Sequence, residues 1–478
     1  MRRLFISGIT AAVAFGAMVL GVPTEATAAG SVTATAAAAP PIKGDYATPI
    51  RYADTNKDID VDATIAKLTG AHVNTYAYLI CYGLRGGRDW NTLPAFLSAA
   101  ADAGIDVWVY ICPPSESKDT AGNEMPPYYL DYVQWATEIA ELSVTYPNLT
   151  GWAIDDFFGN AAKYTRAYTE SMVNAARAVN PAIKFRPVVY YSQLVGYSNM
   201  MGAYRYYIDG VIFPYRNDSS GTDMTNSANA DPETRAVYDA ISCAGSARCA
   251  HFYFPGNTVS AAGWKTSYST TVSVNPTASS YGLTFDVWDD FTGATAGYRY
   301  ARVVVDNTVV FSRDVAGTPA STAVSVSDAV LRPLLAGKSS ATLRVEMYDA
   351  KAVTNFHTAV TFDSITGTGF TVTNGDFDSG TGWTPARSSS VYLYGFVPNM
   401  KPTLMTYASK LAREAIAPSP TYVGAVVDTA LDLATAGITD GSLIYCLNKS
   451  GSDTYDTNNV LTSYAASYNV VASIYGAA

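Results

Sequence analysis

The stretch Gly151-Trp152-Ala153-Ile154-Asp155-Asp156-Phe157-Phe158 decides how the rest of the chain is interpreted. Its apolar first half is typical of a strand that is covered on both faces, and it ends in two adjacent carboxylates. Acids at the end of a buried strand cost free energy unless water, hydrogen bonds or a function offsets that cost. We therefore treat Asp155 and Asp156 as candidate catalytic residues.

The pair can divide two chemical roles between its members. Successive residues of a regular strand point to opposite faces, but where a strand breaks into a loop both can face one cleft. At roughly 6 Å and an effective dielectric constant of about 20, two carboxylates repel by about 3 kcal/mol, or about two pKa units. One acid then stays ionised while the other holds a proton near neutral pH, as glycoside hydrolysis requires. The structural alternative is that one Asp caps the following helix and the other binds loop amides.

The beginning of the chain has the features of an export signal. Residues 1–28 contain Arg2 and Arg3, an apolar segment from 4 to 22, and a small-residue cleavage site at 26–28. This order predicts a secretory signal peptide. Residues 29–45, rich in Ala, Thr and Pro, are expected to form a flexible lead-in. Because no later stretch is long and apolar enough to span a bilayer, we expect a secreted, extracellular protein with no membrane partner.

The composition narrows the choice of partner. The chain has 31 Lys and Arg against 41 Asp and Glu, a formal net charge of −10, and no basic patch. Nucleic acid and anionic membranes are therefore not expected as partners. The 35 tyrosines offer aromatic faces with hydroxyl groups, which suit sugar rings as well as packed cores. The tyrosine content is compatible with a carbohydrate substrate, which is the partner we expect from the residues at the strand ends.

Five cysteines suit an exported protein with disulfides. Cys243 and Cys249 enclose a short loop, and a bridge between them would contribute about 2 kcal/mol. Cys81 and Cys112 fall at the ends of two expected neighbouring strands, so a second bridge is possible, whereas Cys446 is expected to be a buried thiol. No pair has a metal-binding spacing, and no cofactor is expected.

Strands and helices alternate over most of the chain, with one long interruption. Six strand–helix units precede residue 252, beginning with an expected short strand at 48–53, and two more follow residue 397. Between them the pattern has a period of two with Gly, Asn, Asp and Ser turns and no convincing amphipathic helix, which predicts an antiparallel sandwich. Eight units close a barrel only if the sandwich is an insertion. The prediction is an α/β protein, a (β/α)8 TIM barrel formed by 46–251 and 398–478, with a jelly-roll-like all-β sandwich at 252–397 inserted between units 6 and 7.

Active sites of such barrels lie at the C-terminal ends of the strands. The side chains expected there are hydroxyls, amides and acids, without a histidine cluster or a glycine-rich phosphate loop, so the rim resembles a sugar site. A structural role is an alternative for each: the arginines can pair with acids, and the tyrosines can be packed residues with bonded hydroxyls. The expected substrate-binding residues are Arg51, Tyr78, Tyr110, Glu116, Tyr190, Tyr191, Gln193, Tyr215, Arg216, Tyr445 and Asn448, and Asp54, Tyr82, Asp218 and Tyr407 share this rim.

Four acids of the sandwich have two interpretations. Asp286, Asp289, Asp290 and Asp363 could hold a structural calcium ion, and turn acids explain them equally well.

Two motifs resemble known families. The segment Trp152–Phe157 resembles the adjacent-aspartate signature of barrel glycoside hydrolases that use substrate assistance, such as the O-GlcNAcase and related hexosaminidase families. The resemblance implies that Asp155 orients and polarises the 2-acetamido group of the substrate, and that Asp156 is the general acid and then the base. In the sandwich, 362–365, 374–377 and Trp383 resemble edge pieces of galactose-binding-like jelly rolls, which implies either a sugar-binding domain or one that shapes the cleft.

Three hypotheses follow. The leading one is a secreted glycoside hydrolase that acts on a polysaccharide or glycoconjugate through Asp155 and Asp156. The second keeps one of these acids and recruits a more distant carboxylate, Glu116 or Asp218; the separation of the carboxyl groups then decides between inversion and retention. The third is a non-catalytic carbohydrate-binding protein on a degenerate barrel.

Overall fold

The computed structural model describes most of the chain from residue 39 onward. The described ranges are 39–54, 56–195, 201–216, 226–243, 246–254, 259–289, 295–316, 320–354, 358–388, 393–408, 418–447 and 465–478. The predicted signal peptide at 1–28 lies outside them. Within these ranges, no helix combines the length and the apolar character needed to cross a bilayer.

Eight parallel strands form one curled sheet in the order β5-β4-β3-β2-β1-β19-β18-β6. The sheet closes on itself beyond its two outer strands: the Ile212 amide donates to the Pro187 carbonyl (2.9 Å), and the Val189 amide donates to the Ile212 carbonyl (3.0 Å). The predicted TIM barrel is confirmed. Its strands are β1 (Ile42–Tyr46), β2 (Thr75–Ile80), β3 (Asp106–Ile111), β4 (Leu149–Ile154), β5 (Lys184–Phe185), β6 (Val211–Pro214), β18 (Pro402–Tyr407) and β19 (Gly441–Tyr445).

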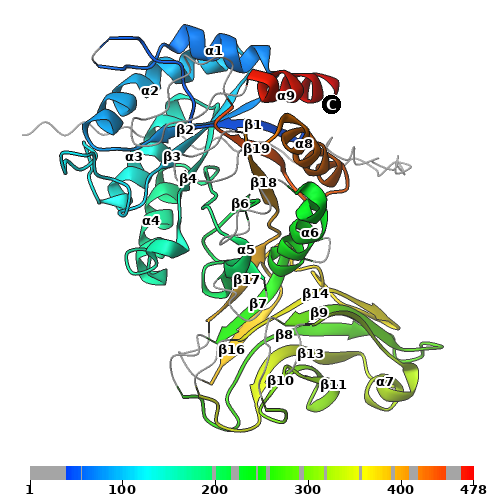
Figure 1. Ribbon diagram of the computed structural model, residues 1–478. Coiled ribbons are helices and arrows are strands. Elements are labelled where there is room, and N and C mark those ends of the chain that lie inside the picture. The colour runs from blue at the N-terminus through cyan, green and yellow to red at the C-terminus, as the bar shows by residue number, and fades with distance from the viewer. Residues whose placement is uncertain are drawn as a thin grey trace, which may run out of the picture. The chain divides into compact units, whose positions relative to one another are not determined.

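Helices surround the barrel on its outer side (Figure 1). Outward-facing strand residues pack against them: Tyr76 and Tyr78 of β2, for example, contact the ring of Phe96 in α2. The alternate residues of the strands form a separate cluster inside the barrel. The helices are α1 (Val61–Gly70), α2 (Leu84–Asp102), α3 (Tyr132–Thr145), α4 (Arg166–Val179), α5 (Tyr191–Leu194), α6 (Ala230–Ile241), α8 (Pro420–Thr435) and α9 (Ala465–Ala477), with short 3-10 turns at Phe158–Asn160, Met201–Ala203 and Ser227–Asn229.

The inserted domain consists of two antiparallel sheets that share one apolar core. It follows α6 and precedes β18, so it lies between barrel units 6 and 7, as predicted. One sheet has the order β12-β9-β14-β7-β17, and the other has the order β11-β10-β13-β8-β15, with β16 also paired to β8. The strands are β7 (Arg248–Phe254), β8 (Lys265–Val274), β9 (Gly282–Asp289), β10 (Arg299–Val305), β11 (Thr308–Asp314), β12 (Ala320–Val326), β13 (Ser340–Asp349), β14 (Thr358–Thr368), β15 (Phe370–Thr371), β16 (Thr384–Arg387) and β17 (Leu393–Pro398).

Some predicted boundaries were wrong. The first barrel strand is 42–46, not 48–53, so the end of the predicted lead-in is a central strand. The first sandwich strand starts at Arg248 rather than after 251. The sandwich also contains one helix, α7 (Asp328–Leu335), whose Leu331 and Leu335 are buried in its core. This helix was missed because it spans only two turns and contains Pro333.

An ion pair buried behind β1 explains why that strand was missed. Asp45 and Lys67 of α1 are almost fully buried, with their charged atoms 3.4 Å apart. The Lys67 ammonium also donates to the carbonyl and the hydroxyl of Thr48 (2.6 and 3.0 Å). Burial is the main cause that raises the pKa of Asp45, to about 6, and Lys67 opposes it. Because residues 42–46 include polar side chains, the sequence did not indicate a strand there, although both faces of this strand are covered.

Replacing Lys67 by Met tests this ion pair. The variant leaves the Asp45 carboxylate buried without its cation, so we expect the free energy of unfolding near pH 7 to fall by about 3 to 5 kcal/mol. Urea denaturation followed by circular dichroism measures the change.

The matched control is the double variant Asp45→Asn/Lys67→Met, which removes both charges. It should be more stable than Lys67→Met alone, because no unpaired charge remains. Equal stability of the two variants would contradict the assignment of the loss to an unpaired charge.

Candidate active site

Asp155 enters the barrel interior from the end of β4. Its amide donates to the Ile111 carbonyl of β3 (3.1 Å), so the residue continues the ladder for one position beyond the strand. Ala153, two residues earlier, belongs to the inner cluster, and strand alternation places Asp155 on the same side. One oxygen of Asp155 accepts the Asp156 amide (2.9 Å), and the other lies 3.4 Å from the Tyr46 hydroxyl.

Asp156 leaves the strand through a left-handed turn. Its φ of +41° breaks the alternation, which is the condition for both acids to face one site. The Tyr190 hydroxyl donates to Asp156 Oδ1 at 2.5 Å. Tyr190 is held in turn by Gln193, whose side-chain oxygen accepts the Tyr190 amide (3.0 Å). The segment after β5 thus fixes the second carboxylate of the pair.

Tyrosine rings fill the C-terminal end of the barrel interior. Tyr46 stacks on Tyr110 with ring centroids 4.0 Å apart, and its centroid is 5.2 Å from that of Tyr445. The ring centroid of Tyr407 lies 5.1 Å from that of Tyr445. The Tyr110 side chain is fully buried among these rings. The acids therefore lie beside a preformed aromatic surface that offers hydroxyl groups.

The surroundings of Asp155 favour its protonated form. Loss of water around the carboxyl raises its pKa well above the usual value, and the charges of Asp156 and Glu116 raise it further. The hydrogen bond from the Asp156 amide opposes this effect without reversing it. Burial also raises the pKa of Tyr190, so this phenol keeps its proton and remains a donor to Asp156. The site thus contains a carboxyl group that keeps its proton to higher pH than an ordinary aspartic acid does.

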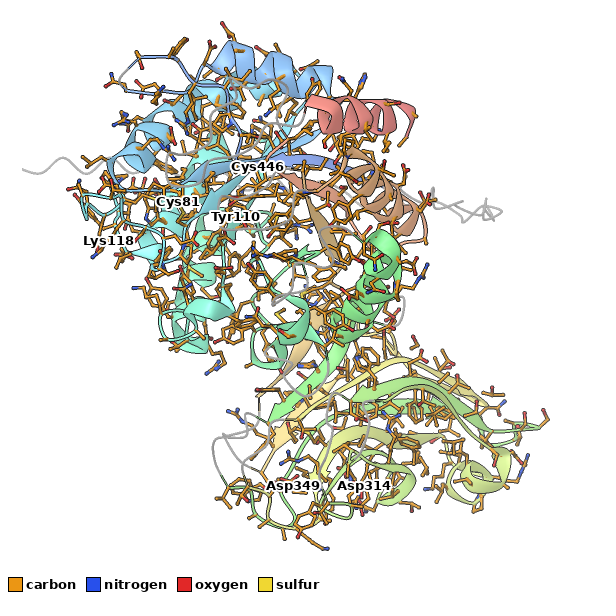
Figure 2. All side chains as sticks on the ribbon, in the orientation of Figure 1. Cys81, Tyr110, Lys118, Asp314, Asp349 and Cys446 are labelled. Atoms are coloured by element: carbon orange, nitrogen blue, oxygen red, sulfur yellow. A yellow bond between two sulfur atoms is a disulfide. The ribbon has the colours of Figure 1, made fainter. Side chains whose placement is uncertain are left out.

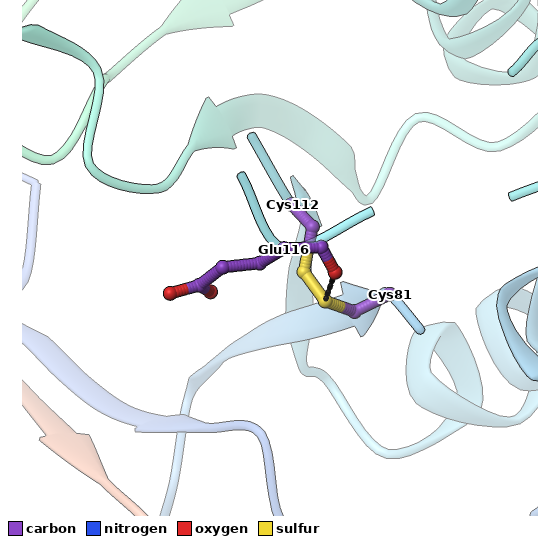
Figure 3. A group of neighbouring side chains, drawn as sticks. All are labelled: Cys81, Cys112 and Glu116. Atoms are coloured by element: carbon purple, nitrogen blue, oxygen red, sulfur yellow. Dashed lines mark hydrogen bonds between the residues drawn. A yellow bond between two sulfur atoms is a disulfide. The ribbon is translucent and has the colours of Figure 1, made fainter. Parts of the chain in front are cut away.

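Glu116 reaches the site from the loop after β3. A disulfide between Cys81 and Cys112 joins the ends of β2 and β3 beneath this loop, and Cys81 Sγ lies 3.6 Å from the Glu116 carbonyl. Figure 3 shows the Glu116 side chain extending away from the disulfide. Figure 2 labels Cys81 and Tyr110 on these neighbouring strands. The bridge fixes the base of the loop that carries the third carboxylate.

Left-handed backbone also gathers at this end of the barrel. Besides Asp156, the non-glycine residues Ala47, Tyr82 and Cys446 have φ values of +72°, +63° and +64°, and each follows the end of a barrel strand. Such conformations are unfavourable for side chains other than glycine, and they cluster at functional sites. The backbone thus marks the same rim as the carboxylates do.

Several predicted residues meet here. They are Asp155, Asp156, Tyr110, Glu116, Tyr190 and Tyr445, with Gln193 behind Tyr190. The guanidinium carbon of Arg216 lies 5.8 Å from the ring centroid of Tyr407, so Arg216 belongs to the same rim. Tyr46 was missed because β1 was placed too late in the sequence; the alternation of 42–46 could have found it.

Other predicted residues lie on the helix side of the strands. Arg51 forms a two-pronged ion pair with Asp89 (2.8 Å for both contacts), and the Tyr78 hydroxyl donates to the Asp89 carbonyl. Tyr215 is fully buried and donates to the Asn226 carbonyl (2.7 Å), and Tyr191 packs against Phe213. These positions do not support the prediction that Arg51, Tyr78, Tyr191 and Tyr215 bind substrate. The alternation of residues along a strand does not indicate which of the two faces of the strand points into the barrel. Asn448 and Asp218 lie outside the described residues.

No metal centre is evident in the described part of the chain. Among the residues that the structure describes, the one group of three potential ligands that lie close together is Cys81, Cys112 and Glu116, and its two sulfur atoms are joined in the disulfide. In the sandwich, Asp289 pairs with Arg313 (3.0 Å), and Asp363 accepts the Ser364 amide (2.7 Å). Asp286 and Asp363 face each other across β9 and β14, and among the described residues no close group of three potential ligands includes them; Asp290 is not described.

Two further cysteines are also linked. Cys243 forms a disulfide with Cys249, and Cys446 is buried and belongs to neither disulfide.

Parts of the chain are similar to several solved structures. No family model and no curated protein matches it. The catalytic domain of the hyperthermophilic chitinase from Pyrococcus furiosus matches with 15% identity and a TM-score of 0.29, over 42% of this chain and 67% of that chain. A GH5_18 protein from Streptomyces cattleya, in complex with Manb1-4GlcNAc, matches with 13% identity and a TM-score of 0.33, over 42% and 58%. The exo-beta-1,4-mannosidase Op5Man5 from Opitutaceae bacterium strain TAV5 matches with 12% identity and a TM-score of 0.31, over 42% and 43%. These matches each cover less than half of this chain, so we base the functional proposal on the geometry of the site.

Removing a neighbouring charge tests the electrostatics of Asp155 without any assay of activity. Glu116→Gln and Asp156→Asn each delete a negative charge, so ionisation of Asp155 becomes easier and its pKa should fall, more in Asp156→Asn because Asp156 has the larger effect. Carboxyl carbon NMR of protein with labelled aspartate measures the titration. Glu170→Gln, a control in an exposed ion pair on α4, should leave it unchanged; an unchanged Asp155 titration in all three variants would contradict the proposed charge cluster.

The two disulfides should differ in their effect on stability. Cys81 and Cys112 are 31 positions apart and Cys243 and Cys249 only 6, so loop-closure entropy assigns about 3.5 kcal/mol to the first bridge and about 2 kcal/mol to the second. The double variant Cys81→Ala/Cys112→Ala should therefore unfold at lower urea concentration than Cys243→Ala/Cys249→Ala. The reverse order would show that entropy of the unfolded chain does not dominate.

Proposed function

We propose that this protein is a secreted glycoside hydrolase that cleaves glycosidic bonds of a polysaccharide or glycoconjugate. The observation that carries the proposal is the gathering of Asp155, Asp156 and Glu116 beside stacked tyrosines at the C-terminal end of the barrel. Two carboxyl groups in different protonation states are the minimum that this reaction requires. Tyrosine rings and hydroxyls supply contacts for the apolar face and the hydroxyl groups of a sugar.

Asp155 is the better candidate for the general acid. Its burial and its acidic neighbours favour a protonated carboxyl group, which can donate its proton to the glycosidic oxygen as the bond breaks. Asp156, bound by the Tyr190 hydroxyl, is the candidate for the ionised partner. This division reverses the roles that the resemblance to O-GlcNAcase-type enzymes implies for the pair.

Substrate assistance is compatible with the reversed roles. An ionised Asp156 can accept a hydrogen bond from the N–H of a 2-acetamido group and orient its oxygen toward the anomeric carbon. With a neutral sugar, the same carboxylate can instead activate a water molecule or attack directly. The acetamido group is thus a question about the substrate, which a panel of glycans answers.

Glu116 is the second candidate for the ionised partner. Its charge is close enough to Asp155 to raise the pKa of that residue, and its loop is fixed by the Cys81–Cys112 disulfide. In this version Asp155 remains the acid and Glu116 is the base or nucleophile. Comparison of Asp156→Asn with Glu116→Gln identifies the partner, because the residue that acts as base or nucleophile causes the larger loss of turnover.

Substitution of the acids is the direct test of catalysis. We expect Asp155→Asn to lower kcat by roughly 10²- to 10⁴-fold on a glycan that the wild type cleaves, with substrate binding largely kept. Release of reducing sugar from acetamido-containing and neutral glycans measures turnover. In wild type, activity should fall as pH rises through the raised pKa of Asp155, and Glu116→Gln should move this decline to lower pH.

The control is Asp231→Asn, which alters an exposed ion pair with Arg235 on α6 and should keep full activity. Unchanged turnover in both Asp155→Asn and Asp156→Asn would overturn the catalytic assignment. Binding of glycans by a wild type that cleaves none of them would favour the non-catalytic carbohydrate-binding protein.

A further inference from the structure

A second candidate binding site lies on the outer layer of the barrel. Helices α2 and α3 and the loop before α3 line a pocket of about 430 Å³ that is open to solvent. We call it the α2–α3 pocket. This volume falls within the range of small-molecule sites. The lining residues that matter here are Trp90, Asn91, Tyr128, Glu138, Glu141 and Leu142.

The α2–α3 pocket is separate from the carboxylate site. Trp90, Tyr128 and Leu142 pack against the core between strands and helices, whereas Tyr110 belongs to the core inside the barrel. Strand β3 lies between these two cores, because its alternate residues contribute to each. A ligand in the α2–α3 pocket therefore does not contact Asp155.

The aromatic wall of the α2–α3 pocket is held rigidly. Trp135, fully buried behind it, donates its indole N–H to the Tyr129 carbonyl (3.0 Å). Its ring lies edge to face with that of Trp90 (centroids 5.1 Å apart, planes at 89°) and with that of Tyr128 (centroids 4.8 Å apart, planes at 84°). Trp90 and Tyr128 are themselves 5.9 Å apart at 80° and only half-buried, so each keeps accessible ring surface. Rings fixed in this way bind without losing rotational freedom.

The charge of the α2–α3 pocket is one-sided. Glu138 and Glu141 lie one helical turn apart on α3, and the residues that line the pocket include no Lys or Arg. Burial, together with the hydrogen bond and charge of Glu138, raises the pKa of Tyr128 to about 12, so its hydroxyl remains a hydrogen-bond donor. Carboxylates next to aromatic faces attract a ligand cation and an apolar ligand face at the same time.

We propose that the α2–α3 pocket binds an amino sugar with a free, protonated amine, whose ring lies against Trp90 and whose ammonium group lies beside Glu138 and Glu141. The proposal is independent of turnover at Asp155. It gives the protein a second, non-catalytic contact with a glycan chain that carries unacetylated amines.

Calorimetric titration of the full chain with a glucosamine tetrasaccharide tests the proposal, and the Asp155→Asn background prevents cleavage during the measurement. We expect Glu141→Gln and Trp90→Ala each to weaken binding by about tenfold. The N-acetylated tetrasaccharide, which has the same rings without the charge, should also bind about tenfold more weakly. Glu170→Gln on α4 is the matched control and should bind like the parent.

Glu141 is exposed, so its replacement by Gln tests the α2–α3 pocket even if Trp90→Ala impairs folding. Unchanged affinity in Glu141→Gln, or equal affinity for the acetylated and free-amine sugars, would overturn the proposal. Neither result would affect the glycosidase proposal, because heat of binding is measured without turnover. Conversely, loss of cleavage in Asp155→Asn would not by itself support the α2–α3 pocket.

Discussion

The architecture depends on the closure of the barrel between the segment after β5 and strand β6. Two hydrogen bonds, from the Ile212 and Val189 amides, convert an open sheet with two free edges into a continuous cylinder. Pro187 lacks an amide hydrogen, so it takes part in the closure through its carbonyl, and the next contact comes from the Val189 amide. Only after closure do the ends of β1, β3, β4, β18 and β19 point to one place, and the acids and tyrosines meet.

The same closure sets the electrostatics. Inside the cylinder Asp155 is partly buried and has acidic neighbours, so its proton is held more tightly than on an open sheet edge. Tyr190 donates to Asp156 from a different element, and the disulfide fixes the loop of Glu116. The differing surroundings of Asp155 and Asp156 thus come from three segments that are separate in the sequence: the end of β4, the segment after β5 that carries Tyr190, and the loop after β3 that carries Glu116. A pair of identical side chains acquires two different environments in this way.

The insertion leaves the barrel intact because its ends are adjacent. Its first strand, β7, pairs with its last, β17, so that Cys249 lies opposite Val397. The Cys243 amide also donates to the Asn399 side chain (2.9 Å), which ties the entering chain to the leaving chain. The two ends of the insertion therefore lie side by side, at the place where a simple loop would otherwise connect α6 to β18. This arrangement explains how β6 and β18, whose paired residues are 191 positions apart in the sequence, form neighbouring strands.

The sequence by itself determined the element types, the split barrel and the acidic pair, because hydrophobic periodicity reflects local geometry. The apolar run before Asp155 and the alternating stretches of the sandwich needed no knowledge of distant partners. The tertiary structure alone decided which side of each strand faces inward. Arg51 and Tyr78 lie beside Asp89 on the helix side, while Tyr46 and Tyr110 stack inside the barrel. It also revealed β1, since Asp45 is polar in sequence but is buried in an ion pair with Lys67. Ion pairs and ring contacts between distant segments leave no periodic signal in the sequence. The kinds of residue in the site could therefore be proposed from the sequence, but which individual residues line the site could be seen only in the folded structure.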